Sequence, residues 1–143
     1  MVYDPNCVDK ELVRGDSRRY RVTVSEPKTG TNTDPSRIPL TGASIRWTMK
    51  PWDQENKFRP VVGPSVIKTS DNLLEVEILD QNDPETEGQF VVKLVPLDTK
   101  YLDPGIYVYD AQVTTAAGDV YTVARGRIFL KADSSAAEDL TPP

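Results

Sequence analysis

Histidine is absent from the 143-residue sequence, and cysteine occurs once, at Cys7. Without histidine the chain lacks the usual general base near neutral pH, the Ser-His-Asp arrangement and the commonest metal ligand. A single cysteine allows no intrachain disulfide, so stability must come from packing, as is typical of a reducing compartment. With no histidine to act as its base, we expect Cys7 to be a bystander thiol. The sequence therefore predicts a protein that is not an enzyme, without catalytic residues, cofactor or metal.

Long hydrophobic runs are also missing, and none approaches the roughly 20 residues of a membrane-spanning helix. Met1–Lys10 lacks the basic-then-apolar pattern of a secretory signal, so we expect no such signal and no membrane partner. The net charge of −5 disfavours non-specific nucleic-acid binding, because a polyanion would be repelled on average. Arg14, Arg18, Arg19 and Arg21 are close in sequence, but strand alternation would point them to both faces.

What the sequence does contain is short apolar segments that alternate with period two, separated by glycine and proline. Ile106–Val113 follows the turn residues Asp103-Pro104-Gly105 and is predicted to be a central strand. One of its faces carries Tyr107, Tyr109, Ala111 and Val113. Further strands are predicted at Glu11–Val13, Arg18–Glu26, Ser44–Lys50, Val61–Thr69, Leu73–Leu79, Gln89–Val95 and Val120–Leu130.

Alternation also assigns side chains to the core. Trp47, centred in its segment, is predicted to be a core anchor. Tyr107 lies two residues past Gly105, which is typical of a tyrosine corner whose hydroxyl returns to nearby backbone. Leu74 is predicted to face inward, and a single helical turn is expected in Asp98–Leu102.

In the last segment, Gly126 is predicted to mark a bulge. Tyr121, Val123 and Arg125 are predicted to share one face of that strand, because they are two residues apart. Pro64 in the predicted strand Val61–Thr69 indicates an edge strand or a bulge, since proline has no backbone N–H to donate to a neighbouring strand.

Seven or eight short strands spaced by turn signals predict an antiparallel β-sandwich. We expect this sandwich to span residues 9–132. A flexible arm is expected at residues 1–8 and a flexible tail at residues 133–143, because both are polar and lack periodicity.

Two motifs have a functional and a structural interpretation. Arg14-Gly15-Asp16-Ser17 matches the cell-adhesion tetrapeptide, but we expect a tight turn in which Gly15 takes a positive φ and Asp16 or Ser17 caps a backbone amide. The acidic segment Asp80–Gly88 offers oxygen ligands for Ca²⁺ but lacks the ligand spacing of a known calcium loop. We expect a solvated hairpin loop there, and Ca²⁺ binding stays open.

Trp52, Phe58 and Tyr101 fall in or near predicted loops. Aromatic residues of this kind carry much of the energy of protein–protein interfaces, so these three are the candidate protein-contact residues. Because exposed aromatic rings also stack on sugars, a carbohydrate-binding module is an alternative.

Several turn-plus-strand segments occur in a fixed order, at Leu12–Ser17, Pro39–Trp47, Asp98-Thr99, Leu102–Asp110, Gly118–Val120 and Gly126–Leu130. This order, from Glu11 to Asp133, resembles the N-terminal immunoglobulin-like domain of phage baseplate upper proteins and related small phage tail proteins. The resemblance implies an immunoglobulin-like sandwich. It also implies a virion structural protein of the tail or baseplate, made in the host cytoplasm and acting as a non-catalytic assembly or adaptor module. Its partners would be other phage structural proteins in multiple symmetric copies. A capsid decoration protein is the alternative within that interpretation.

Overall fold

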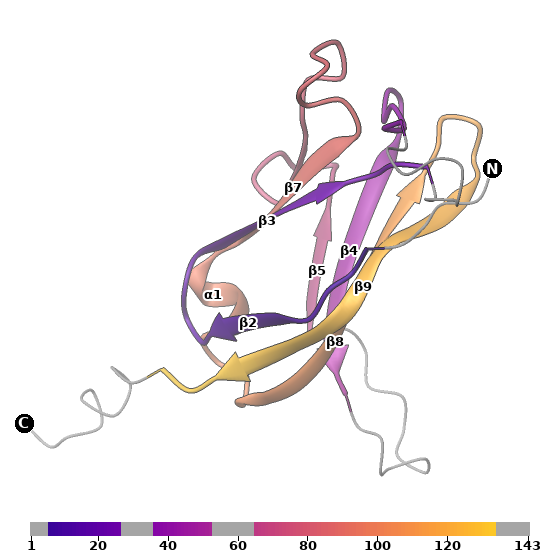
Figure 1. Cartoon of the computed structure of the whole chain (residues 1–143). Helices are drawn as coiled ribbons and strands as arrows, with labels where there is room; N and C mark the ends of the chain where they lie inside the picture. Colours follow the sequence, from indigo (N-terminus) through magenta and orange to yellow (C-terminus); the bar gives the residue numbers. More distant parts are fainter. Residues whose placement is uncertain (1–5, 27–35, 53–64, 134–143) are drawn as a thin grey trace, which may run out of the picture.

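The described residues form two β-sheets packed face to face (Figure 1). The computed structural model describes residues 6–26, 36–52 and 65–133. The predicted all-β sandwich is confirmed. Within the described residues, no helix has the length and hydrophobicity needed to cross a membrane. The contact candidate Phe58 and the first part of the predicted strand Val61–Thr69 lie outside the described residues.

The larger sheet has the strand order β1-β9-β8-β4-β5, and β2 also pairs with β9. The smaller sheet has the order β3-β7-β6, and a four-residue helix, α1 (Pro96–Thr99), follows β7. The bounds of the larger sheet's strands are β1 (Asn6–Cys7), β2 (Lys10–Val13), β4 (Ser44–Pro51), β5 (Val66–Thr69), β8 (Gly105–Thr114) and β9 (Val120–Lys131). Those of the smaller sheet are β3 (Arg18–Thr23), β6 (Val76–Ile78) and β7 (Gln89–Leu94).

This strand order is that of an immunoglobulin-like sandwich. In that fold strands C, F and G form one sheet, extended by C′ in the variable type, while B, E and D lie in the other. Strands β4, β8 and β9 correspond to C, F and G, β5 corresponds to C′, and β3, β7 and β6 correspond to B, E and D. The predicted central strand is confirmed, because β8 lies between β9 and β4.

The core lies between the sheets and is built around β8 and β4. The inward face of β8 is buried along its whole length, with Tyr107, Tyr109, Ala111 and Val113 no more than 6% exposed. Trp47 is 1% exposed, and its ring stacks on that of Tyr109 with centroids 6.0 Å apart. The hydroxyl of Tyr107 donates to the backbone oxygen of Asp103 at 2.6 Å, so the predicted tyrosine corner is confirmed.

Two edge strands depart from the antiparallel prediction. Strands β1 and β2 both pair with β9 in parallel. Val8 lies between them, its N–H donating to the Arg125 oxygen and its oxygen accepting from the Tyr109 hydroxyl. Residues 6–8 therefore belong to the sheet, and the prediction that residues 1–8 form a free arm is wrong for these three. Strand β1 has only two residues, which is too short to show an alternating pattern. The sequence therefore does not reveal its pairing with β9.

The predicted bulge lies at a different residue. The register of β8 and β9 shifts between Ala111 and Gln112, whose partners are Ala124 and Thr122, so Val123 is the extra residue. An extra residue inverts the alternation. Val123 and Ala124 are consequently both buried, whereas Arg125 is exposed and does not share the face of Val123 as predicted.

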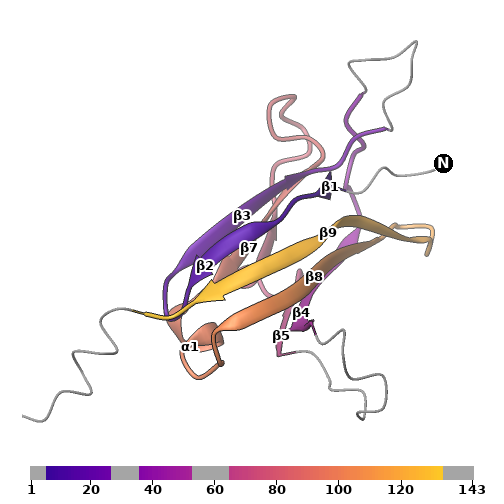
Figure 2. The ribbon, with the colours of Figure 1, turned by 60° about the horizontal axis from the view of Figure 1, so that its bottom comes forward.

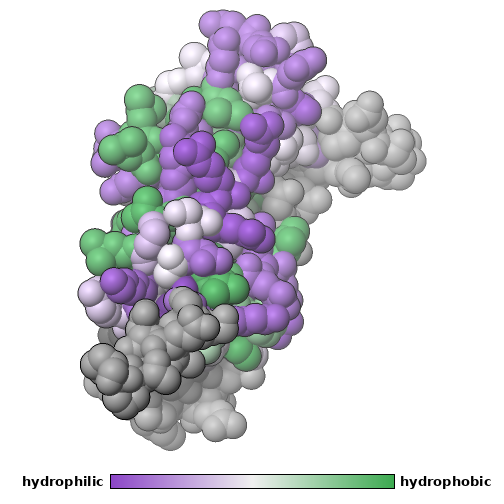
Figure 3. Space-filling view, turned by 90° about the vertical axis from the view of Figure 1, so that its left-hand side faces the viewer, coloured by the Kyte–Doolittle hydropathy of each residue, from purple (hydrophilic) through white to green (hydrophobic). Residues whose placement is uncertain are grey.

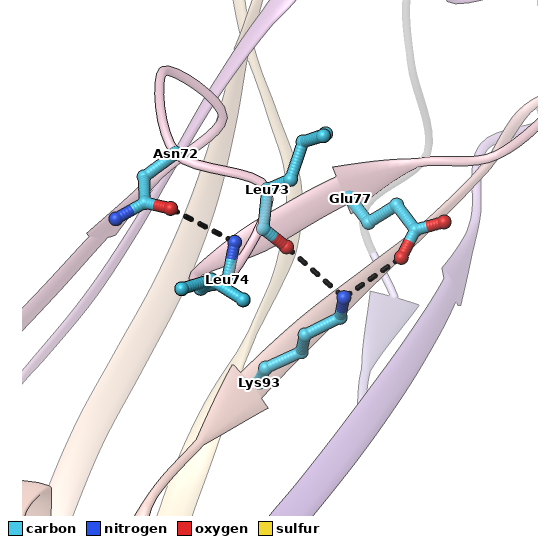
Figure 4. A network of polar contacts seen from close by, with 5 residues as sticks. All are labelled: Asn72, Leu73, Leu74, Glu77 and Lys93. Atoms are coloured by element: carbon cyan, nitrogen blue, oxygen red, sulfur yellow. Dashed lines mark hydrogen bonds and ion pairs between the residues drawn. The ribbon is translucent and has the colours of Figure 1, made fainter.

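A turn replaces the first half of the predicted strand Leu73–Leu79. The side-chain oxygen of Asn72 accepts from the Leu74 N–H at 2.9 Å, and the Lys93 ammonium donates to the Leu73 oxygen and to Glu77 (Figure 4). Leu74 is 76% exposed, so its predicted inward orientation is wrong. Asparagine side chains favour such turns over strands, because they bond their own backbone two residues on.

Helix α1 begins two residues before the helical turn that the sequence predicts. Its Asp98 carboxylate accepts from the Val95 N–H at 2.7 Å and pairs with the Lys68 ammonium at 2.8 Å. Lys68 lies on β5 and is only 6% exposed. A buried ammonium needs a charged partner, so this ion pair fixes the edge of the larger sheet to the connection that leaves the smaller one.

We predict that Gly126→Ala destabilises the protein by roughly 1–3 kcal/mol, the usual cost of overpacking. A Cβ at position 126 would overlap the Val8 carbonyl oxygen and lie 2.9 Å from its carbon. Chemical denaturation measures the loss, and hydrogen exchange of the Val8 amide should accelerate. Arg125→Ala, at the neighbouring exposed residue, is the control. Equal stability of the two variants would contradict the close approach of Val8 to β9.

Candidate interaction surface

The outer face of the larger sheet carries a hollow of about 480 Å³ over β4, β8 and β9. It is lined mainly by outward side chains of these strands, together with Tyr109, Gly126 and one residue of the segment between β1 and β2. Its charged lining residues are Asp9, Lys50, Asp110, Arg125 and Arg127. Two carboxylates and three cations face the same depression. Together with the aromatic residues Trp52 and Phe129 beside Arg127, they form what we call the outer-face surface.

Arg127 contacts a carboxylate and two aromatic rings on this surface. Its guanidinium pairs with Asp9 at 2.8 Å, and its backbone N–H donates to the same carboxylate at 3.1 Å. The guanidinium carbon lies 5.7 Å from the ring centroid of Trp52 and 5.4 Å from that of Phe129. A planar guanidinium is attracted to aromatic faces, so Arg127 is held by one carboxylate and two rings.

The electrostatics of this pair follow from the two hydrogen bonds. They lower the pKa of Asp9 from its ordinary value of 3.8 and raise the pKa of Arg127. Because both side chains are about half exposed, water and salt screen the pair, and its contribution to stability is small. The main effect of the pair is to hold the Arg127 guanidinium beside Asp9 at the hollow.

The hollow also contains polar groups on β4 and β8. The Thr48 hydroxyl donates to the Asp110 carboxylate at 2.9 Å, and Asp110 stands opposite Arg125 in the register of β8 and β9. Lys50 is exposed at the end of β4. This arrangement can bind a charged or aromatic group, because it offers donors and acceptors at defined positions on a rigid sheet.

The structure separates the sequence-predicted contact residues. Trp52 directly follows β4 and is half-buried. Its backbone N–H donates to the Ile106 backbone oxygen at 3.0 Å. Tyr101 lies in the turn after α1 and is 79% exposed. Among the described residues no ring contact joins the two, so the surface contains Trp52 without Tyr101.

Sequence reasoning did not single out Arg127, Phe129 or Asp9. Alternation alone gives the face of Arg127 and Phe129 correctly once one extra residue is counted in β9, and the structure places that residue at Val123. The partnership of Asp9 and Arg127 joins positions 118 residues apart, and no local pattern contains it.

The Arg14-Gly15-Asp16-Ser17 segment is a tight turn between the two sheets, and the predicted positive φ of Gly15 is confirmed. Gly15 has a φ of 84°, and the Asp16 N–H donates to the Val13 oxygen at 3.1 Å. The Thr99 hydroxyl, fully buried, accepts from the Gly15 N–H at 2.9 Å. The turn is thus anchored to α1.

The acidic segment folds as a series of turns. The Asp80 carboxylate accepts from the Asn82 N–H and that of Asp83 from the Glu85 N–H, both at 2.9 Å. The Gln81 side chain accepts from the Leu40 and Gly88 N–H groups. In the described part of the chain, no three Asp, Glu, Cys or His residues are grouped as metal ligands would be.

Comparison with known proteins gives matches to solved structures alone. No family model matches the chain, and no curated protein matches it. Among 25 matching chains of solved structures is one described as murine CRIg, which is 9% identical. The alignment covers 88% of this chain and 92% of that one, with a TM-score of 0.33. A similarity this distant carries no argument about ligands or partners.

We predict that the pKa of Asp9 lies below 3.8 in the folded protein, and that it rises toward 3.8 in the Arg127→Gln variant. A lowered pKa means that the pair stabilises the fold above the ordinary pKa and loses this contribution as the pH falls through the lowered value. Carboxyl chemical shifts followed by NMR against pH measure both values. Identical titration of Asp9 in the two proteins would show that the hydrogen bonds to Arg127 do not persist in solution.

Proposed function

We propose that the protein is a virion structural protein of a phage tail or baseplate. It acts as a non-catalytic assembly or adaptor module, and it docks on other phage structural proteins through the outer-face surface. The phage context comes from the ordered segments of the sequence. The docking surface comes from the geometry of Arg127, Trp52 and Phe129.

The pre-organised Arg127 is the observation that carries the docking proposal. Tryptophan and arginine are the residue types most enriched among those that dominate binding energy at protein interfaces. A side chain already fixed by Asp9 and two rings loses little conformational entropy on binding, which favours affinity. An arginine placed only to balance charge would not need two aromatic neighbours.

The charges of the hollow indicate the chemistry of the partner. It holds three cations, Lys50, Arg125 and Arg127, against the carboxylates Asp9 and Asp110, although the whole chain has a net charge of −5. Opposite local charge steers association and fixes orientation. A partner surface with acidic and aromatic side chains therefore fits the hollow.

Hydrophobic side chains elsewhere on the surface occur in separate groups. Figure 3 shows several such groups divided by hydrophilic residues on the face that it displays. Among the exposed large hydrophobic residues are Leu73, Leu74, Leu97 and Tyr101, which are 68–79% exposed. In a symmetric particle, several weak contacts made by each copy add to firm attachment without a single large interface.

We predict that mass spectrometry of purified virions detects the protein, and that Trp52→Ala and Arg127→Ala each reduce its copy number at least severalfold. Each change removes a side chain of the type that anchors interfaces. Tyr101→Ala is the matched control, because Tyr101 is an exposed aromatic residue outside the outer-face surface.

Absence of the wild-type protein from the particle would refute the phage proposal. Its presence together with unchanged incorporation of Trp52→Ala and Arg127→Ala would refute the docking surface alone. Electron microscopy with a labelling antibody places the protein on the tail if the proposal is correct, and on the head if it is a decoration protein.

A further inference from the structure

A second recess lies on the open side of the sandwich, between β2 of the larger sheet and β3 of the smaller one. Figure 2 shows the two strands running side by side there. In the described chain β2 pairs only with β9, and β3 only with β7, so both are edge strands. A groove of about 550 Å³ between them is lined by residues 8–11 and 17–20.

A smaller cavity of about 190 Å³ continues from this groove into the core. The two share Val8, Lys10 and Tyr20. Beyond the shared residues the cavity is lined by the apolar and aromatic side chains of Val22, Trp47, Tyr109 and Ala124, and by the polar residues Arg21 and Thr23. The recess therefore combines a charged mouth with a partly apolar floor. We refer to it as the β2–β3 cleft.

The mouth of the cleft holds two cations without a carboxylate partner in the described chain, Lys10 and Arg18. The carboxylates that line the same groove are already paired elsewhere, Asp9 with Arg127 and Glu11 with Lys131. The Lys10 ammonium lies 4.6 Å from the ring centroid of Tyr20. Burial and, second, the positive charge of Arg18, which lines the same groove, lower the pKa of Lys10.

Tyr20 supplies the third polar group. It is 7% exposed, and its hydroxyl proton has no acceptor among the described residues. Buried hydroxyl groups are nearly always hydrogen-bonded, because leaving one unpaired costs its full desolvation penalty. Burial raises the pKa of Tyr20, while the charge of Arg18 and its side-chain contact with the hydroxyl act in the opposite direction. Because arginine can only donate, the hydroxyl is still an unused donor beside Arg18.

We propose that the β2–β3 cleft binds a carboxylate attached to a small apolar group. The carboxylate lies between Lys10 and Arg18 and accepts a hydrogen bond from the Tyr20 hydroxyl. The apolar group enters the cavity against Val22 and Trp47. An anion there relieves the repulsion between the cations and satisfies the hydroxyl, and a cavity of about 150 Å³ already accommodates benzene.

Such a carboxylate has two sources with the same chemistry, a small organic acid or the C-terminal residue of a protein. The proposal does not rest on the proposed function. The linings of the two sites have only Asp9 and Tyr109 in common, and Lys10, Arg18 and Tyr20 do not line the outer-face hollow. Failure of one proposal therefore leaves the other intact.

The test uses the full chain, isotopically labelled, with four probes in two matched pairs. The first pair is 3-methylbutanoate and its uncharged analogue 3-methylbutanamide. The second is the peptide acetyl-Ala-Ala-Leu with a free and with an amidated C-terminus. We expect saturable NMR shifts at the Val22 amide and the Trp47 indole with one or both free carboxylates, and none with the two amides. Which carboxylate binds more tightly identifies the source.

Three variants assign the binding to the cleft. Arg18→Gln and Tyr20→Phe should each weaken the carboxylate roughly tenfold or more, as expected for the loss of a hydrogen bond to a charged group. Arg46→Gln is the matched control, because Arg46 is an exposed arginine of β4 that lines neither the groove nor the cavity. Tyr20→Phe should also melt at the wild-type temperature or above, since it removes only an unpaired hydroxyl.

The proposal is overturned if no free carboxylate binds, or if the amides bind as tightly as the acids. It is equally overturned if Arg46→Gln weakens binding as much as Arg18→Gln. A Tyr20→Phe variant that melts at a lower temperature and binds the carboxylate normally would show that the hydroxyl serves the fold and not a ligand.

Discussion

The stacking of Trp47 on Tyr109 is the interaction on which the rest of the structure depends. In immunoglobulin domains a buried tryptophan of strand C packs against a disulfide between strands B and F, whose second cysteine lies two residues after the tyrosine of the corner. Here that position is Tyr109, two residues after Tyr107, and the single cysteine of the chain allows no intrachain disulfide. An aromatic ring replaces the cross-link. Its hydroxyl also bonds Val8, so the same side chain fixes the edge strand β1 to the core.

The position of β8 determines what the molecule presents to its surroundings. With Tyr107 and Tyr109 inside, Val108 and Asp110 must lie on the outer face, because side chains alternate along a strand. The extra residue Val123 then sets the parity of β9 and directs Arg127 to the same face. A slip of one residue in either strand would move the outer-face surface into the core. The packing of the inward side chains of β8 and β9 therefore also determines which side chains lie on the outer-face surface. One strand register specifies both the core residues and the proposed contact residues.

The parts of the fold that depend on local chemistry could be predicted from the sequence. The alternation around Trp47 and the turn before Tyr107 contain enough information for the central strands and the tyrosine corner. What failed depended on contacts between distant residues or on a single side chain. Asn72 forms a turn with its side chain where the residues that follow it favour a strand. No hydrophobic periodicity in the sequence reveals the parallel pairing of Asn6 and Cys7 with β9. For the candidate site the sequence supplied Trp52 but not Arg127, whose role arises from an ion pair with Asp9.

The central claim is that Trp52 and its neighbours on the outer face of the larger sheet are covered by a partner in the assembled particle. Hydroxyl-radical footprinting of the free protein and of intact virions, read by mass spectrometry, tests this claim without any substitution. The account predicts that oxidation of Trp52 and Phe129 falls in the particle by a larger factor than that of Tyr101. Equal oxidation of Trp52 in both samples, with protection at Tyr101 instead, would contradict it.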